Sequence, residues 1–208
     1  MHQSRHRTLF AGAAHKDEGS AVMRSFWKRR AEKTVEPGEY RVHKLAMKED
    51  PSGLRKLLDE NREMVNEAEE GMLHTPLMLA VEMERTESVR LLLEHGADPN
   101  LQNIEGRTAL HLLPERQPIA WTGIENKLKI AELLLRHGAD LATCDRYGGQ
   151  PLWYAVFYVK EPEDVQLVEM YLAYGADSNY KNENNGQSAL DFATKVAYRP
   201  LVEVLEGK

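Results

Sequence analysis

Histidine and cysteine are the side chains in this sequence best suited to hold a metal ion or to act as a catalytic base or nucleophile. The 208 residues contain eight histidines and one cysteine, Cys144. A closed zinc site needs about four ligands at short spacings, and His2, His6 and His15 form no such set. A lone cysteine forms no internal disulfide, and its thiol would need a rigid pocket shared with a histidine to act as a nucleophile. We therefore expect no metal, no cofactor and no catalytic residue.

The glycines also follow no catalytic pattern. No stretch fits the phosphate loop G-x-x-x-x-G-K-[ST] or the nucleophile elbow G-x-S-x-G. The composition, 42% hydrophobic and 29% charged, is typical of a globular domain. No apolar run approaches the ~18 residues that span a bilayer, and the N-terminus lacks the apolar region of a signal peptide. We expect a non-enzymatic cytoplasmic protein.

One short pattern occurs twice between residues 75 and 142. The first copy begins with Thr-Pro-Leu at Thr75 and ends with Leu-Leu-Leu-x-x-Gly-Ala-Asp at Asp98; the second begins with Thr-Ala-Leu-His at Thr108 and ends in the same way at Asp140. Thr75 and Thr108 are 33 residues apart, which is the period of the ankyrin repeat. The sequence therefore resembles the ankyrin repeat family. This resemblance implies an all-α solenoid of helix-turn-helix repeats joined by short hairpin loops.

On this resemblance, residues 39–208 form an ankyrin repeat domain of about five repeats. We place the repeats at approximately residues 40–70, 71–103, 104–145, 146–183 and 184–208. Asp50 and Thr75 each precede a proline, as suits an N-cap residue followed by proline at the first helical position. Gly96 suits the left-handed residue that ends a helix. Terminal repeats are often atypical, which explains why the first lacks both motifs.

The recurring histidines receive structural roles. In the family's motif, the histidine at the place of His111 braces neighbouring repeats by hydrogen bonds. His95 and His137 stand beside helix C-termini, where an imidazole meets free carbonyl groups. Cys144 falls in a hairpin, as an ordinary thiol.

Two repeats depart from the 33-residue period. Thr108 and Gln150 are 42 residues apart, and the excess lies at residues 114–123, where two prolines and a glycine prevent a continuous helix. Gln150 and Ser188 are 38 residues apart, and the excess lies around residues 158–164. We predict an insertion between the two helices of the third repeat and another in the fourth.

The N-terminal residues 1–38 differ in charge from the rest of the chain. Up to residue 35 there are eight basic and three acidic residues, a net charge of +5, and the remainder has 19 basic and 30 acidic residues, a net charge of −11. We interpret residues 1–38 as a basic arm that is either a solvated or capping segment or an anchor for a membrane, nucleic acid or a partner. An acidic body disfavours nucleic acid along the main surface.

Partners of ankyrin repeat proteins usually dock on the hairpin tips and the exposed side of the first helices, which together form a concave groove. Carried over position by position, this resemblance places Met72, His74, Glu82 and Met83 at exposed positions of the second repeat. Large aromatic residues at exposed positions make strong anchors, so Tyr147, Phe157 and Tyr158 are the leading candidates. The alternative is that the insertions fold over these rings. The predicted partner-binding residues are Tyr147, Phe157, Tyr158, Trp121, Arg116, Glu115, Arg146, Arg107, Ile104 and Met83.

The sequence thus predicts a protein-binding module that is monomeric when free and acts through the groove of its third and fourth repeats. Small ankyrin proteins of this kind also resemble immunity proteins that inhibit a toxin, and an acidic body would complement a basic toxin or enzyme. The second hypothesis is an adaptor tethered by the basic arm to a membrane or nucleic acid. Neither reading involves a small-molecule substrate.

Overall fold

The computed structural model describes residues 41–48, 50–115 and 123–207. The arm predicted for residues 1–38, and Arg116 and Trp121 of the first insertion, lie outside them. Residues 42–208 make up one compact unit. The described residues form helices and contain no strand. The α-helices are α2 (Arg41–Met47), α3 (Pro51–Glu60), α4 (Pro76–Glu82), α5 (Thr86–Glu94), α6 (Ala109–Leu112), α7 (Ile124–Arg136), α8 (Pro151–Phe157), α9 (Val165–Ala173), α10 (Ala189–Val196) and α11 (Arg199–Leu205), with 3₁₀ turns η2 (Arg62–Asn66) and η3 (Pro162–Asp164).

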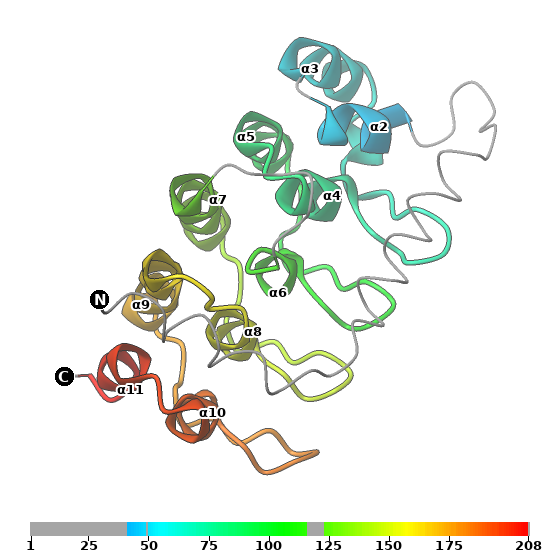
Figure 1. Ribbon diagram of the computed structural model, residues 1–208. Helices are drawn as coiled ribbons and strands as arrows, with labels where there is room; N and C mark the ends of the chain where they lie inside the picture. The colour runs from blue at the N-terminus through cyan, green and yellow to red at the C-terminus, as the bar shows by residue number, and fades with distance from the viewer. Residues whose placement is uncertain (1–40, 49, 116–122, 208) are drawn as a thin grey trace. The chain divides into compact units, whose positions relative to one another are not determined.

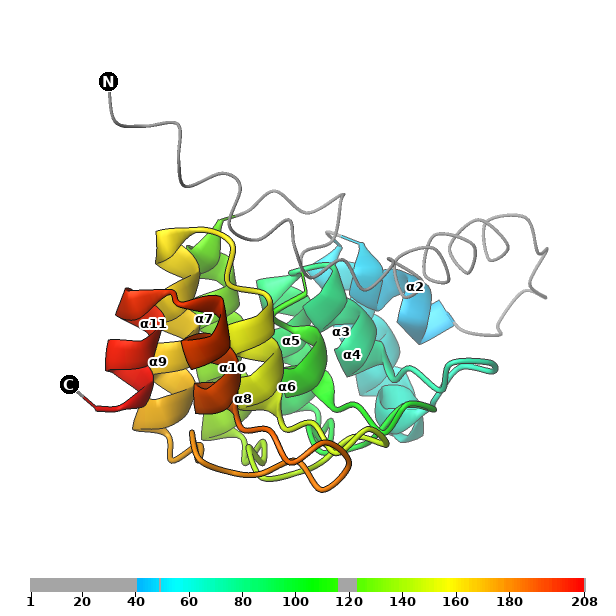
Figure 2. The same cartoon turned by 60° about the horizontal axis from the view of Figure 1, so that its bottom comes forward.

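The helices stand in two rows (Figure 1). The even-numbered helices form one row, in which α4, α6, α8 and α10 pack in sequence, and α3, α5, α7, α9 and α11 form the other. Each of α4, α6, α8 and α10 also packs against the helix that follows it. Loops leave the side of the even-numbered row, and Figure 2 shows them gathered at one end of the helices. This is the all-α solenoid that the sequence predicts.

Local capping chemistry sets where the helices begin. The Asp50 carboxylate accepts a hydrogen bond of 3.0 Å from the Gly53 amide at the start of α3. The Thr75 hydroxyl accepts one of 3.3 Å from the Met78 amide at the start of α4. Both caps are followed by proline, whose missing N–H is not needed there. The two predicted N-caps are confirmed.

The odd-numbered helices end in a repeated way. Gly96 has φ of +90°, the left-handed conformation that ends α5. The Nδ1 of His95 lies 2.7 Å from the carbonyl oxygen of Leu91, and that of His137 lies 2.8 Å from the carbonyl oxygen of Leu133. Both imidazoles therefore satisfy a carbonyl group in the last turn of their helix, as predicted.

The core follows the line between the two rows. Leu92 of α5, Leu134 of α7 and Val168 of α9 are fully buried, because each of these helices packs between the preceding and following odd-numbered helix. Tyr171 of α9 is also fully buried, and its hydroxyl donates a hydrogen bond of 3.0 Å to the carbonyl of Leu110 in α6. Burial raises the pKa of this hydroxyl. A helix pair alone could not bury these residues, so the stack needs its neighbours.

A buried lysine holds the end of α6. The Lys127 ammonium of α7 donates hydrogen bonds to the carbonyl oxygens of Pro114, at 2.9 Å, and Glu115, at 3.2 Å. It also lies 3.9 Å from the carboxylate of Glu84. The helix α6 is only four residues long, so these contacts fix the direction in which the chain leaves it.

Two positions that the family register places at exposed sites are buried. Glu82 of α4 is 2% exposed, and His74 is 1% exposed. Their side chains turn toward each other, with the Glu82 carboxylate 3.9 Å from His74 Nδ1 and that of Glu69 4.0 Å away. The prediction of exposure was wrong for both residues because their polar groups meet within the stack. None of the helices in the described part of the chain has the length and apolar character needed to cross a bilayer.

Candidate functional site

His111 makes structural contacts through both nitrogen atoms of its ring. His111 accepts a hydrogen bond of 3.1 Å from the Thr108 amide at Nδ1, and its Nε2 lies 3.1 Å from the carbonyl oxygen of Gly149. Burial lowers the pKa of His111 to about 4. The imidazole therefore joins the start of α6 to the hairpin that precedes α8, which confirms its predicted bracing role.

The single cysteine is half-buried in the hairpin between α7 and α8. Its Sγ lies 3.2 Å from the hydroxyl of Tyr180 in the next hairpin. This hydrogen bond, together with burial, raises the pKa of Tyr180 to about 12. In the described residues no group of three histidine, cysteine or carboxylate side chains is arranged to hold a metal ion.

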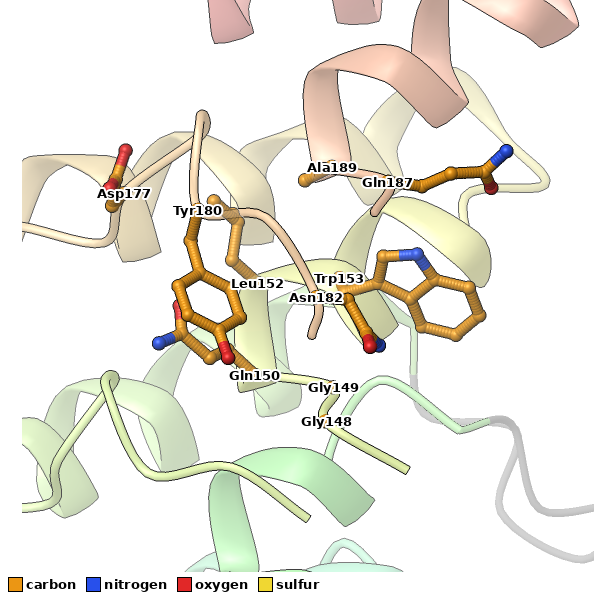
Figure 3. Close-up of a pocket in the computed structure, with 10 residues that line it drawn as sticks. All are labelled: Gly148, Gly149, Gln150, Leu152, Trp153, Asp177, Tyr180, Asn182, Gln187 and Ala189. Atoms are coloured by element: carbon orange, nitrogen blue, oxygen red, sulfur yellow. The ribbon is translucent and has the colours of Figure 1, made fainter. Parts of the chain in front are cut away.

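Two hollows in the described surface are a narrow crevice and an open depression. The crevice lies between the hairpins before α8 and α10, where the rings of Tyr180 and Trp153 flank the glycine pair Gly148–Gly149 (Figure 3). Its volume of about 10 Å³ is enough for one water molecule. The depression, of about 510 Å³, is open to solvent beside α3 and α5. It is lined by Pro51, Ser52, Arg55, Lys56, Asp59, Glu60 and Glu87.

The hairpin tips are joined to one another by hydrogen bonds. The Ile104 amide donates to the carbonyl of Met72 at 2.9 Å, and the Arg146 amide donates to the carbonyl of Glu105 at 3.0 Å. The side-chain amide of Asn182 donates to the carbonyl of Tyr147 at 2.9 Å. These links form an ordered edge along the stack that joins the backbones of neighbouring tips.

Arg107 sits at the base of this edge. Its guanidinium lies 4.9 Å from the centre of the Tyr154 ring, and Nη1 is 3.2 Å from the Glu105 carboxylate. The buried Asp145 accepts hydrogen bonds from the Tyr154 hydroxyl and from the amides of Tyr147, at 2.9 Å, and Gly149, at 2.8 Å. Burial raises the pKa of the Tyr154 hydroxyl. Arg107 is therefore a half-buried group held in one position.

The carboxylate of Glu115 lies close enough to interact with the Arg107 guanidinium. Burial raises the pKa of its carboxyl, and Arg107 and a hydrogen bond from Tyr158 oppose that rise. Four of the predicted partner-binding residues, Arg107, Glu115, Tyr147 and Tyr158, thus belong to one connected region. Met83, at the end of α4, is half-buried.

An aromatic cluster continues from this region onto α8 and α10. It consists of Trp153, Phe157, Tyr158 and Phe192, all half-buried. The rings of Trp153 and Phe157 are stacked at 5.0 Å, Phe157 lies 5.7 Å from Phe192, and Tyr158 meets the Phe157 ring edge-on at 5.2 Å. The rings shield part of one another and still present apolar surface to solvent.

Sequence reasoning found Phe157 and Tyr158 but missed Trp153 and Phe192. The missed signal was the spacing of Trp153 and Phe157, which are four residues apart and so lie on one face of a helix. Phe192 belongs to the next even-numbered helix and enters the cluster because α10 packs against α8. Arg146, Ile104 and Tyr147 are exposed at the hairpin tips.

Comparisons with known proteins agree with the repeated helix pairs of this fold. The family model for ankyrin repeats in three copies matches residues 42–114, and the model for a single ankyrin repeat matches residues 105–146. The chain belongs to the ankyrin repeat family. Ankyrin repeats generally mediate protein–protein interactions, and such proteins are typically non-enzymatic.

Several relatives share this ankyrin repeat region. The chain is 31% identical over 138 residues to the nuclear factor NF-kappa-B p105 subunit of Gallus gallus, covering 65% of this chain and 13% of that protein. It is 31% identical over 135 residues to the putative ankyrin repeat protein FPV031 of fowlpox virus strain NVSL, covering 63% and 36%. It is 33% identical over 144 residues to the ankyrin repeat domain-containing protein 63 of Mus musculus, covering 67% and 34%. The match therefore spans 13% to 36% of the length of these relatives.

Proposed function

We propose that this ankyrin repeat protein binds one protein partner through the groove formed by its third and fourth helix pairs and the adjoining hairpin tips. The observation that supports this proposal is the half-exposed aromatic cluster, which lies beside the ordered polar region around Arg107. Aromatic anchors surrounded by fixed polar groups are typical of the energetic centre of an interface. The proposed contact residues are Tyr147, Phe157, Tyr158, Glu115, Arg146, Arg107, Ile104 and Met83, with Arg116 and Trp121 of the first insertion.

The partner that best fits this body is a basic protein. Residues 36–208 carry a net charge of −11, the balance of 19 basic and 30 acidic residues, and complementary charge accelerates association and favours the correct partner. Binding over the active site of a basic enzyme or toxin would make the chain an inhibitor or immunity protein of the cytoplasm. The free protein would be a monomer.

Affinity purification tests this function. The tagged full chain is used as bait in extracts of its native cell, beside the double variant Phe157→Ser/Tyr158→Ser and the control Tyr174→Ser. Tyr174 is 47% exposed at the end of α9, outside the proposed groove. Loss of two anchors should weaken capture of the specific protein by about 30-fold or more, whereas the control should capture it normally.

The proposal fails if the double variant, shown to be folded by circular dichroism, retains the same partner. Raising the salt concentration provides a second reading of the partner's charge. Association with a basic protein should slow as salt increases, because salt screens the attraction between exposed charges. An association rate independent of salt would contradict the proposal that the partner is basic. It would not contradict the proposal that the partner binds in the groove.

A further inference from the structure

His74 and Asn103 join the start of α4 to the hairpin that precedes α6. The Nε2 of His74 lies 3.0 Å from the side-chain amide nitrogen of Asn103. The exposed fractions of these side chains are small, 1% for His74 and 5% for Asn103. The Oδ1 of Asn103 also accepts hydrogen bonds from the amides of Glu105, at 2.9 Å, and Arg107, at 3.0 Å. One buried side chain therefore contacts His74 and also holds the hairpin of residues 103–107.

These contacts decide which protonation state of His74 the hairpin requires. Because the Oδ1 of Asn103 accepts from two backbone amides, the amide nitrogen of Asn103 is the atom that faces His74. That nitrogen only donates, so the Nε2 of His74 accepts and the ring proton is on Nδ1. The ordered hairpin therefore requires a neutral imidazole.

Two buried carboxylates face the other ring nitrogen. The Nδ1 of His74 lies 3.9 Å from the Glu82 carboxylate and 4.0 Å from that of Glu69. On the hairpin side the charged groups are Glu105 and Arg107, whose side chains form an ion pair at 3.2 Å. A second proton on the imidazole is attracted by Glu82 and Glu69, because opposite charges interact strongly away from water. The carboxylates thus favour the charged imidazole, whereas the hairpin requires the neutral one.

The next repeat makes the same arrangement around a permanent charge. Arg107 follows His74 by 33 residues and takes the equivalent position. Its Nε lies 3.8 Å from the buried carboxylate of Asp145. The Oδ1 of Asp145 accepts from the amides of Tyr147, at 2.9 Å, and Gly149, at 2.8 Å, which are two and four residues further along the chain. An arginine keeps its charge, whereas a histidine gains or loses one near neutral pH.

We propose that the contact between His74 and Asn103 is a pH switch that releases the hairpin of residues 103–107 when the imidazole is protonated. The added hydrogen on Nε2 faces the hydrogens of the asparagine amide, and two donors make no hydrogen bond. The side-chain amide must then turn its oxygen toward the imidazole. The backbone amides of Glu105 and Arg107 lose their acceptor as a result.

The switch adds regulation to the proposed function, and this consequence rests on that function. Ile104 and Arg107, two of the proposed contact residues, belong to the released hairpin. Their release lowers the affinity for the partner, because ordering them again on binding costs conformational entropy. The partner is therefore held at about pH 7.5 and bound more weakly at about pH 5.5.

NMR spectroscopy of the full chain tests the switch without a partner. The imidazole nitrogen signals report the charge of His74, and amide hydrogen exchange reports the hairpin. Between about pH 7.5 and 5.5, we expect His74 to become charged. The protection factors of the Glu105 and Arg107 amides should then fall at least ~10-fold, while those of Tyr147 and Gly149 in the equivalent hairpin stay unchanged. A neutral His74 at the lower pH, or a charged His74 with unchanged protection, would overturn the switch.

Two variants show whether His74 is the cause. His74→Arg/Asn103→Asp gives this hairpin the pair of side chains that the next repeat has, so the protection of Glu105 and Arg107 should be the same at both pH values. His74→Gln offers an uncharged oxygen to Asn103 and should also remove the pH dependence. If protection falls in these variants as much as in the parent, another group carries the effect and the switch is wrong.

Capture of the cellular partner separates the switch from the proposed function. The parent chain and His74→Gln serve as baits at both pH values. The parent should capture at least ~5-fold less at the lower pH, whereas His74→Gln should capture equally at both. If the parent shows no such loss, or His74→Gln shows the same loss, the regulation fails and the groove stands. The proposed function itself fails if Phe157→Ser/Tyr158→Ser retains the partner at about pH 7.5.

Discussion

The Nε2–H of His111 donates a hydrogen bond to the backbone carbonyl of Gly149 across 3.1 Å. The tautomer follows from the other ring nitrogen, because Nδ1 accepts from the Thr108 amide, which can only donate. A neutral imidazole thus satisfies two backbone groups in neighbouring repeats. Protonation would place a hydrogen on Nδ1 and break the contact with Thr108.

This arrangement predicts a specific pH dependence of stability. Burial lowers the pKa of His111 to about 4 in the folded protein, whereas an unfolded histidine titrates near ~6.5. Between these values the unfolded state binds more protons, so the free energy of unfolding falls as the pH drops from about 6.5 to 4, by roughly 3 kcal/mol from this group. Urea unfolding at a series of pH values measures this fall in the free energy of unfolding.

The variant His111→Asn isolates this contribution from that of the carboxylates. It should be less stable than the parent at pH 7 by about 2 kcal/mol, since buried backbone groups lose their partners. Its stability should then change less between pH 6.5 and 4. Parallel pH profiles for the two proteins would show that His111 does not carry the effect.

Lys127 leads to a second prediction. Its ammonium donates to the carbonyl oxygens of Pro114 and Glu115, so Lys127→Met should reduce the free energy of unfolding by about 3 kcal/mol. It should also speed amide hydrogen exchange at Leu112 and Leu113. Lys129→Met, at an exposed position two residues away, should change stability by less than about 0.5 kcal/mol. Equal stability of the two variants would mean that Lys127 does not anchor the segment after α6.

Much of this fold could be predicted because its signals are local. Asp50, Thr75 and Gly96 act on amides or torsion angles within a few residues, so their roles can be inferred from sequence alone. The packing of Tyr154 against Arg107 could not, because it joins residues of different repeats. The burial of Glu82 and His74 was also missed, although both belong to the second repeat, because their mutual contact overrides the exposed positions that the family register gives them.

The exposure of the candidate site residues was predictable to the same extent. A register counted from the repeats placed Tyr147 and Ile104 at exposed tips, and the structure has them exposed. It could not identify Phe192 as a neighbour of Phe157, because that contact depends on the distance between α8 and α10. Nor could it reveal that Leu73 has a φ of +57°, since a positive φ at a non-glycine residue leaves no mark in the sequence.

The end of α10 carries a third prediction. Ala197 caps this helix with φ of +55° and ψ of +30° and is exposed. Glycine adopts this left-handed conformation without the clash of a Cβ. Ala197→Gly should therefore raise the free energy of unfolding by about 0.5–1 kcal/mol. Ala68→Gly, at an exposed residue with negative φ, should lower it by a few tenths, and thermal unfolding of both variants distinguishes strain relief from a general effect of glycine.

The final prediction concerns a bridge between repeats that the chain makes twice and then omits. The Asn66 side chain accepts from the Asp98 amide at 2.9 Å and donates to the Gly96 carbonyl at 3.4 Å. Asn100 repeats both bonds with Asp140, at 2.8 Å, and Gly138, at 2.9 Å.

The next equivalent residue is the exposed Ala142. Its methyl side chain is too short and has no polar atom to bond Gly175 and Asp177. Its amide donates to Asp140 at 2.8 Å just as the Asn100 amide donates to Asp98 at 2.9 Å, so the local backbone is already in place. Ala142→Asn should therefore raise the free energy of unfolding by about 1 kcal/mol, and Asn100→Ala should lower it by a similar amount, both measured by urea unfolding. Ala142→Asp, which lacks the amide donor and adds a negative charge beside Asp140, should give no gain. If Ala142→Asn is also neutral while Asn100→Ala destabilises, the loop after α9 does not follow the register of its predecessors.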